Sequence, residues 1–419
     1  LARAVARVLR PDAVVVGRDT RESGPVLERA IVDGCAAEGV VVHVMGVAPT
    51  PAVAFASERH GWVGIAITAS HNPWRDNGIK VFAAGGNKLT DAEQVEIERV
   101  WHALTTDTPT VALGSERDAT DALAEYAEHR ARIVGQGLKG LTVVVDCANG
   151  AMSHVATAVM REAGATVIAI NESPDGRNIN DSCGAMHPDA LAARVVAERA
   201  DAGIAFDGDG DRLVAVSGSG LVVDGDRIMV IAANDLAQRG LLRNKGVAVT
   251  VMSNLGLHRA LEQNGIDVVV TPVGDRNVLA ALDEFDFVLG GEQSGHIVHR
   301  AHATTGDGLL AALLLLESLV RARTTLDAAA TAMQTYPQVL LNVRTTERSN
   351  DPVADIAAEI AGVESELAGN GRVLVRASGT EPLVRVMVEA ATESVALACA
   401  GRLADALVAL HGGTVEGIR

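Results

Sequence analysis

One succession of strand and helix patterns recurs three times along this chain, and it constrains the fold more than any other feature. Each copy has a run of β-branched residues, an Ala-rich helical stretch, a glycine and a second apolar strand. Strands that alternate with helices are typical of α/β sheets. The first strands are expected at 14–16, 143–145 and 247–251, the helices end at 36, 163 and 263, and the second strands lie at 40–44, 166–170 and 268–270. Gly39, Gly164 and Gly265 stand where a helix C-cap needs positive φ.

A third apolar strand in each copy leads into a polar loop. The expected strands are 64–67, 203–206 and 287–289, and the loops are TASHNP (68–73), DGDGDR (207–212) and GEQSGH (291–296). Ligands of α/β sheets bind beyond the carboxyl ends of the strands. The three copies therefore bring different side-chain chemistry to the same structural position.

The last segment follows another pattern and predicts a small α+β module, with Pro337 near its entry. We expect strands at 338–346, 372–376 and 384–389 and helices at 351–367 and 393–411, with the stretch RASGTEP (376–382) between the last two strands. The predicted domains are 1–138, 139–240, 241–337 and 338–419.

Composition excludes several classes of function. The chain has 419 residues, with 36 Lys and Arg against 53 Asp and Glu, a net charge of −17 that does not suit nucleic acid or an anionic membrane. The longest apolar run, 309–316, is too short to span a bilayer, and the first ten residues lack the apolar core of a signal peptide. The four cysteines show no C-x-x-C spacing and are typical of reduced thiols. We expect a cytoplasmic protein with no nucleic-acid or membrane partner.

The DGDGDR loop is a candidate metal site. Asp207, Asp209 and Asp211 alternate with glycines that let the backbone curl, so three carboxylates can converge on one hard cation. An EF-hand is excluded, because its sixth and twelfth positions would be Arg212 and Gly218. A solvated acidic turn is the alternative. Mg²⁺ is favoured where the chemistry involves phosphate.

The TASHNP loop places Ser70 after a buried strand. Alone, such a serine is usually a cap or a turn residue, and no G-x-S-x-G elbow supports a hydrolase. A serine brought to a metal site can instead carry a phosphoryl group. Lys80, one of only four lysines, is a candidate proton-transfer group or phosphate partner, with a solvated lysine as the alternative.

The other two loops suit a phosphorylated sugar. Glu292, Ser294 and His296 alternate along GEQSGH and are expected to point the same way, whereas the spacing of His296, His299 and His302 does not favour zinc. RASGTEPLVR resembles a phosphate cradle, and a hairpin turn with surface arginines is the alternative. Its candidate groups are Arg376, Ser378, Gly379, Thr380 and Arg385.

The four loops, in this order and across nearly the whole chain, resemble those of the α-D-phosphohexomutase superfamily. NINDSCGAMH (178–187), TVMSNLGLH (250–258), GGEQSGHI (290–297) and SGTEPLVRVMVE (378–389) are most similar to the bacterial phosphoglucosamine mutase family. The resemblance implies three α/β domains and a C-terminal α+β domain, like the TATA-box-binding protein, around a central cleft. Members usually open with a strand and a T-D-G-x-R-G motif. The chain as given begins beyond both, through truncation or true loss.

The resemblance also implies a mechanism, in which glucosamine 6-phosphate and glucosamine 1-phosphate interconvert through a phosphoserine enzyme and glucosamine 1,6-bisphosphate. One Mg²⁺ per chain would be held by Ser70, Asp207, Asp209 and Asp211. The implied catalytic residues are Ser70, Lys80, His71 and Arg212. Glu292, Ser294 and His296 would hold the sugar, and the RASGTEP loop would hold the phosphate that is not reacting.

Three alternatives stay open at this stage. A phosphoglucomutase or phosphomannomutase would use the same residues on another sugar. A truncated, non-catalytic phosphosugar-binding protein is an alternative of another class, and a magnesium-dependent phosphatase is a third. The oligomeric state is also open, with a homodimer among the alternatives.

Overall fold

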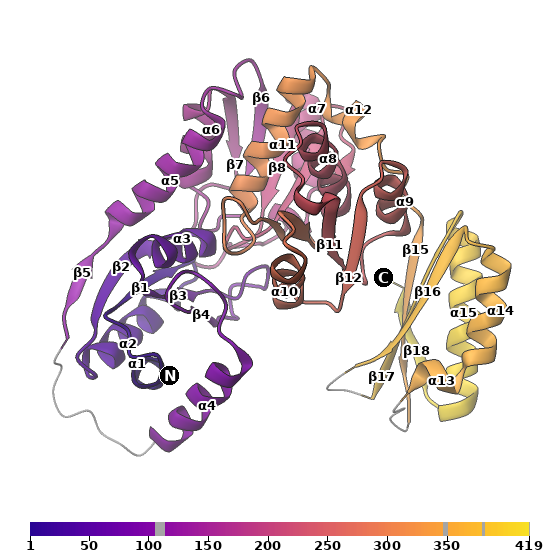
Figure 1. Cartoon of the computed structure of the whole chain (residues 1–419), viewed down its shortest axis with the longest axis horizontal. Helices are drawn as coiled ribbons and strands as arrows, with labels where there is room; N and C mark the ends of the chain where they lie inside the picture. Colours follow the sequence, from indigo (N-terminus) through magenta and orange to yellow (C-terminus); the bar gives the residue numbers. More distant parts are fainter. Residues whose placement is uncertain (105–113, 347–350, 379–381, 419) are drawn as a thin grey trace. The chain divides into compact units, whose positions relative to one another are not determined.

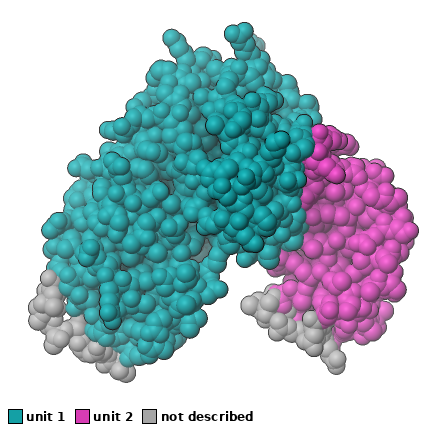
Figure 2. Space-filling model, viewed as in Figure 1, with its two compact units in different colours: residues 1–252, 264–332 teal, residues 253–263, 333–419 magenta. Residues whose placement is uncertain are grey.

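The computed structural model describes residues 1–104, 114–346, 351–378 and 382–418. These residues form two compact units, shown in Figure 2: residues 1–252 with 264–332, and residues 253–263 with 333–419. Three sheets lie in the larger unit and a fourth in the smaller one (Figure 1). The predicted boundaries near 138 and 240 fall inside the larger unit, and all the predicted domain boundaries stay a prediction.

The first sheet has the strand order β4-β3-β1-β2-β5, with β4 antiparallel to β3. Its strands are β1 (Ala13–Arg18), β2 (Val41–Val47), β3 (Val63–Ile67), β4 (Ile79–Phe82) and β5 (Glu116–Asp118). The helices of this part are α1 (Ala2–Leu9), α2 (Gly24–Ala36), α3 (Thr50–His60), α4 (Asp91–Leu104) and α5 (Thr120–Val134). β1 and β3 are buried almost throughout, because helices cover the sheet on both faces.

The second sheet repeats this plan, with the order β10-β9-β8-β6-β7. Its strands are β6 (Thr142–Asp146), β7 (Thr166–Ile170), β8 (Ala202–Phe206), β9 (Leu213–Ser217) and β10 (Val222–Val223). Its helices are α6 (Val155–Glu162), the short η1 (Gly184–Met186) and α7 (Asp189–Glu198).

The third sheet has the order β12-β11-β13-β14. Its strands are β11 (Gly246–Thr250), β12 (Asp267–Thr271), β13 (Leu289–Gly291) and β14 (Ile297–His299). The accompanying helices are α8 (Gly225–Gln238), η2 (Arg243–Lys245), α9 (Leu255–Gln263), α10 (Asp275–Phe285), α11 (Gly308–Ala322) and α12 (Leu326–Ala330). Helix α9 belongs to the smaller compact unit, although it connects two strands of this sheet.

The predicted threefold repeat is confirmed by the strand pairing. In each copy the first strand lies between the second and third strands, parallel to both, and a fourth strand returns antiparallel to the third. Each polar loop therefore joins a buried parallel strand to an antiparallel neighbour. The three predicted cap glycines have φ of 81°, 99° and 65°, as a left-handed helix end requires.

The smaller unit contains an antiparallel sheet with the order β16-β17-β15-β18. Its strands are β15 (Gln338–Arg344), β16 (Gly371–Ala377), β17 (Leu383–Ala390) and β18 (Thr414–Ile418), with helices α13 (Pro352–Asp355), α14 (Ala357–Leu367) and α15 (Glu393–His411). Helix α15 is long and apolar enough to span a bilayer by length and composition. One face of the helix packs into the core of this sheet, as in a core helix of a globular domain, through Ala396, Cys399, Ala400, Leu403, Ala404 and Leu407.

Two expectations about these elements were wrong in detail. The helix expected at 351–367 breaks at Ile356, whose φ of −123° is not helical and whose side chain is buried in the core. The strand expected at 287–289 begins at Leu289, because Asp286 is the left-handed cap of α10 and Phe287 N–H donates to Leu282 O. The strands β4, β5, β9, β10, β14 and β18 have no counterpart among the expected strands.

Candidate functional site

The serine loop and the acidic loop meet, although they are far apart in the sequence. Ser70 follows β3, is 9% exposed and has φ of 51°, a value unusual for a residue other than glycine. Its Oγ donates a hydrogen bond of 2.5 Å to Oδ2 of Asp207, which follows β8. A hydroxyl is thus fixed against a carboxylate of another sheet.

Arg21, which is not among the residues predicted from the sequence, holds the serine loop in this conformation. Its side chain is fully buried and donates to the backbone oxygens of Ser70 (2.9 Å), Asn72 (2.8 Å), Asp76 (2.9 Å) and Pro73. Arg21 follows β1 in the stretch GRDTR, at the carboxyl end of the central strand. The rule that singled out the three loops therefore applied to this stretch as well.

Three further side chains fix both backbone groups of Ser70. Asn180 Nδ2 donates to Ser70 O at 2.9 Å. Thr68 Oγ1 accepts from Ser70 N–H at 2.9 Å and donates to Asp19 Oδ2 at 2.7 Å. Asp19 in turn pairs with Arg21 Nε at 2.8 Å. The backbone of Ser70 is thus immobilised, while its hydroxyl faces the acidic loop.

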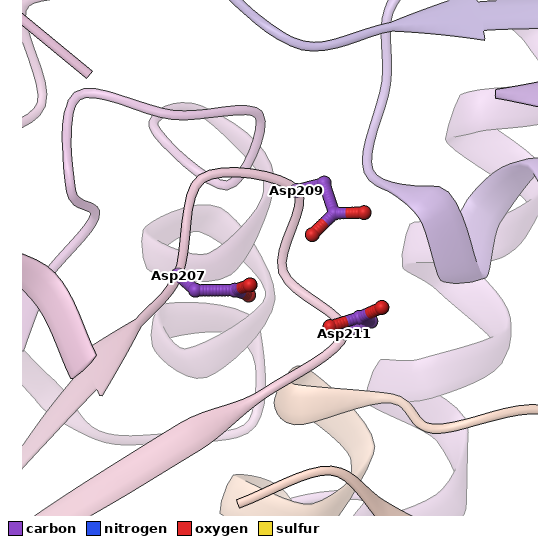
Figure 3. Close-up of side chains that lie close together, drawn as sticks. All are labelled: Asp207, Asp209 and Asp211. Carbon is purple, nitrogen blue, oxygen red and sulfur yellow. The ribbon is translucent and has the colours of Figure 1, made fainter. Parts of the chain in front are cut away.

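Figure 3 shows the three aspartates on the curled loop that joins β8 to β9. Asp207, Asp209 and Asp211 are buried, and one carboxylate oxygen of each lies within 4.8 Å of the others. Asp209 Oδ1 and Asp211 Oδ1 make no hydrogen bond with any residue that the structure describes. Burial, with the charges of the other two, raises the pKa of Asp207 well above its ordinary value. Clustered, buried carboxylate oxygens of this kind fit a hard divalent cation.

Two basic side chains balance part of this negative charge. Lys80 Nζ lies 2.7 Å from Asp209 Oδ2 and 2.8 Å from Asp211 Oδ2, and Arg212 Nε lies 3.8 Å from Asp211 Oδ1. Burial alone would lower the pKa of Lys80, but the two carboxylates outweigh it and the pKa is raised, so the ammonium stays charged. Burial alone would raise the pKa of Asp211, but Lys80, followed by His296 and Arg212, lowers it well below its ordinary value.

His71 lies beside the serine, with Nδ1 3.5 Å from Ser70 Oγ. Burial, together with the charge of Arg212, lowers the pKa of His71. The imidazole is therefore neutral near pH 7. It contributes hydrogen bonding rather than positive charge to this cluster.

The third loop separates into two parts. Ser294 Oγ donates to Glu292 Oε2 at 3.2 Å, whereas His296 is 3% exposed and has Nδ1 3.6 Å from Asp211 Oδ1. The expected common orientation of the three side chains was wrong, because Gly295 has φ of 89° and interrupts the extended backbone. His296 lies against the acidic loop, and the other two side chains hydrogen bond to each other.

The fourth loop belongs to the smaller unit. Arg376 of β16 and Arg385 of β17 are directly paired in the antiparallel register, and neither guanidinium has an ion-pair partner among the described residues. Burial and the neighbouring Arg385 lower the pKa of Arg376. Two adjacent guanidinium groups suit a dianion. Ser378 N–H donates to Leu383 O at 2.7 Å, and Gly379 and Thr380 lie outside the described residues.

Comparison with family models finds all four domains of one family along the chain. Residues 1–107, 124–220 and 224–336 match phosphoglucomutase/phosphomannomutase α/β/α domains I, II and III, and residues 340–406 match the C-terminal domain. A phosphoglucosamine mutase of Parafrankia sp. is 51% identical over 411 residues, which cover 97% of this chain and 88% of the relative.

Solved structures show the same fold. A phosphoglucomutase/phosphomannomutase family protein of Burkholderia thailandensis has a TM-score of 0.80 and 27% identity, covering 99% of this chain and 94% of that one. An N-acetylphosphoglucosamine mutase of Aspergillus fumigatus, solved with GlcNAc-6P and magnesium, has a TM-score of 0.65 and 21% identity, covering 87% and 93%.

Proposed function

The chain belongs to the phosphoglucomutase/phosphomannomutase family of isomerases, within the α-D-phosphohexomutase superfamily, and on that basis we propose that it interconverts glucosamine 6-phosphate and glucosamine 1-phosphate. The choice of sugar is supported by relatives described as phosphoglucosamine mutases at about half identity over most of the chain. We further propose that it acts in the cytoplasm. The product would feed amino-sugar nucleotide and peptidoglycan precursor synthesis.

One observation carries the proposed mechanism: the hydroxyl of Ser70 lies 2.5 Å from a carboxylate of the acidic cluster. A phosphate on this oxygen would enter a site that already contains Lys80 and Arg212. Such a site can stabilise the charge of a moving phosphoryl group, and phosphoryl transfer depends mainly on this and on alignment.

The reaction proceeds in two balanced transfers. The phosphorus–oxygen bond to Ser70 breaks as the phosphorus bonds to the free sugar oxygen, whose proton leaves, and Ser70 regains a proton. The product is glucosamine 1,6-bisphosphate. The intermediate then reorients in the site. Its other phosphoryl group is transferred to Ser70, which leaves the isomeric monophosphate.

Mg²⁺ is the proposed metal, one per chain, with Asp207, Asp209, Asp211 and the phosphate of Ser70 as its ligands. Two of these carboxylates have an oxygen without a hydrogen bond among the described residues, as expected of groups that bind a cation. When bound, the ion would offset charge on the phosphoryl oxygens. It would also relieve the repulsion among the three carboxylates.

The basic side chains have separate proposed roles. Lys80 and Arg212 hold positive charge beside the phosphoryl group, and the raised pKa of Lys80 argues against its acting as a general base. His71, neutral near pH 7, can accept the proton of the sugar hydroxyl. His71 Nδ1 lies 3.5 Å from Ser70 Oγ, which leaves no room for a substrate oxygen between them. The serine loop would therefore have to move before the sugar hydroxyl could reach His71.

Sugar binding is assigned to the third and fourth loops. Glu292 and Ser294 would bind sugar hydroxyls or the amino group, and His296 would act from its place beside Asp211. The phosphate that is not reacting would be bound by Arg376, Ser378, Gly379, Thr380 and Arg385.

The direct test supplies the chain with glucosamine 6-phosphate, Mg²⁺ and a trace of the bisphosphate, and follows ³¹P NMR. We expect a new signal from the anomeric phosphate and no inorganic phosphate. Ser70→Ala should abolish it. The same assay on glucose and mannose phosphates compares kcat/KM among the three sugars. Preference for another sugar would reassign the substrate, release of inorganic phosphate would indicate a phosphatase, and binding without isomerisation would indicate a non-catalytic protein.

A further inference from the structure

The start of helix α11 supports the backbone of the acidic loop. Gly308 N–H donates to Gly210 O at 3.0 Å, and Gly210 stands between two of the clustered aspartates. A Cβ on Gly308 would lie 2.5 Å from Arg212 O, so the helix touches the loop with no side chain between them. The position of this helix end therefore fixes where the acidic loop runs.

Asp307 fixes the same helix end from the other side. Its Oδ1 accepts from Leu310 N–H at 2.9 Å, which makes it the N-cap of α11. The same carboxylate accepts from the hydroxyl of Tyr126 at 3.0 and 3.1 Å and from Arg130 Nε at 2.8 Å. Both donors belong to α5, a helix from another part of the chain.

Tyr126, Arg130 and Asp307 form a buried cluster, which we call the α5–α11 clamp. Their side chains are at most 1% exposed. Burial and the charge of Asp307 raise the pKa of Tyr126 well above its ordinary value, so its hydroxyl remains a donor. The Arg130 guanidinium also donates to His302 O and lies over the rings of Phe55 and Tyr126. These contacts hold the guanidinium in place beside Asp307.

The buried ion pair of Arg130 and Asp307 is not explained by a gain in folding stability. A buried ion pair can often be replaced by apolar side chains of similar volume with little loss, because desolvation offsets the attraction. Directional hydrogen bonds do, however, fix the place of the groups they join. The clamp joins α5 to the cap of α11, and the first residue of α11 joins that cap to Gly210.

We propose that Tyr126, Arg130 and Asp307 are positioning residues of the metal site, which set the spacing of the carboxylates through Gly308 and Gly210. This inference rests on the proposed function, because it takes Asp207, Asp209 and Asp211 as metal ligands. As positioning residues they would act through the backbone of the acidic loop and would not be ligands of the metal. Their effect should appear in the affinity for the metal.

The test measures binding of Mn²⁺ alone, without substrate, by the loss of the free Mn²⁺ signal in electron paramagnetic resonance. Tyr126→Phe keeps the shape of the ring and removes one hydrogen bond. We expect it to raise the Kd for Mn²⁺ at least five-fold. Arg130→Met should raise it further, and Arg130→Lys should recover part of the loss.

The matched control is Leu316→Val, a core substitution about 12 Å farther along the same helix by its rise per residue. It is expected to lower the melting temperature without changing the Kd. A drop in melting temperature for Tyr126→Phe with the Kd unchanged would overturn the proposal and leave the metal site intact. If the unsubstituted chain binds no Mn²⁺, or if Asp209→Asn binds it equally well, the proposed metal site fails together with this inference.

Discussion

Replacing Arg21 is the sharpest test of how the serine loop is built. The side chain is fully buried and joins the Asp19 carboxylate to four backbone oxygens of residues 70–76. Arg21→Met removes all five interactions. Arg21→Lys keeps the charge but loses the planar fork of donors.

The free energy of unfolding lost in Arg21→Met depends on which buried groups lose their hydrogen-bond partner. Asn180 still donates to Ser70 O and Asn72 O, and the exposed Pro73 and Asp76 can bind water instead. The main loss is the buried carboxylate of Asp19, and breaking one partner of a buried ion pair costs about 3–5 kcal/mol. Arg21→Met should therefore lose about that much free energy of unfolding. The Lys variant should lose about 1.5–3 kcal/mol, the value of one charged hydrogen bond.

Turnover should fall more than stability in the Lys variant. A displacement of Ser70 by about 1 Å is expected to lower kcat on the order of 100-fold. Urea unfolding gives the free energies, and initial rates of isomerisation give kcat. Arg29→Met is the control, because Arg29 is 61% exposed and its ion pairs should contribute less than about 1 kcal/mol. If Arg21→Lys keeps both the stability and the kcat of the parent, the positioning argument for this loop is wrong.

Three further predictions concern other parts of the chain. Arg376→Gln should raise the free energy of unfolding of the ligand-free protein by about 0.2–1 kcal/mol, because it relieves repulsion with Arg385. It should also raise KM for the sugar phosphate on the order of 10-fold, because a charged hydrogen bond to the phosphate is lost. A lower KM would contradict the proposed phosphate site. Mg²⁺ at about 100 times its Kd should stabilise the parent by about 2.7 kcal/mol in thermal unfolding, and a chelator or Asp209→Asn should remove this effect. Burial lowers the pKa of His299 to about 4, so the unfolded chain binds more protons than the folded one between pH 6.5 and 4, and stability should fall by about 3 kcal/mol as pH falls through that window. His299→Gln should flatten this part of the stability curve, and an unchanged curve would show that other groups cause the decline.

Much of the architecture was predictable because it depends on local sequence patterns. Runs of β-branched residues, Ala-rich stretches and the cap glycines set the threefold repeat, and the strand pairing confirmed it. Helix Glu393–His411 was predicted at the bounds it has. The break at Ile356, the strand at 414–418, the antiparallel strand that ends each repeat, and the short β5 and β10 were missed, since tertiary packing decides them.

The candidate site also has residues that local sequence patterns predict and contacts that only tertiary packing sets. Ser70 and the three aspartates could be singled out, because their loops follow the carboxyl ends of apolar strands, where α/β sheets bind ligands. Arg21 also follows a buried strand, so its place could be singled out, but its contacts could not, since its partners are backbone oxygens of a loop some fifty residues away. Asn180 lies in the NINDSCGAMH stretch, and no local pattern predicts its hydrogen bonds to the serine loop.

The sequence by itself determined which chemical groups stand after which strand, because strand periodicity and loop composition are local properties of the chain. Only the tertiary structure decided that Ser70 Oγ meets Asp207, that His296 turns toward Asp211, and that Tyr126 and Arg130 hold the end of α11. Each of these contacts joins residues of separate elements, and their distance depends on how whole sheets and helices pack. Such distances follow from burial and hydrogen bonding summed over the fold, and no single stretch of sequence contains that information.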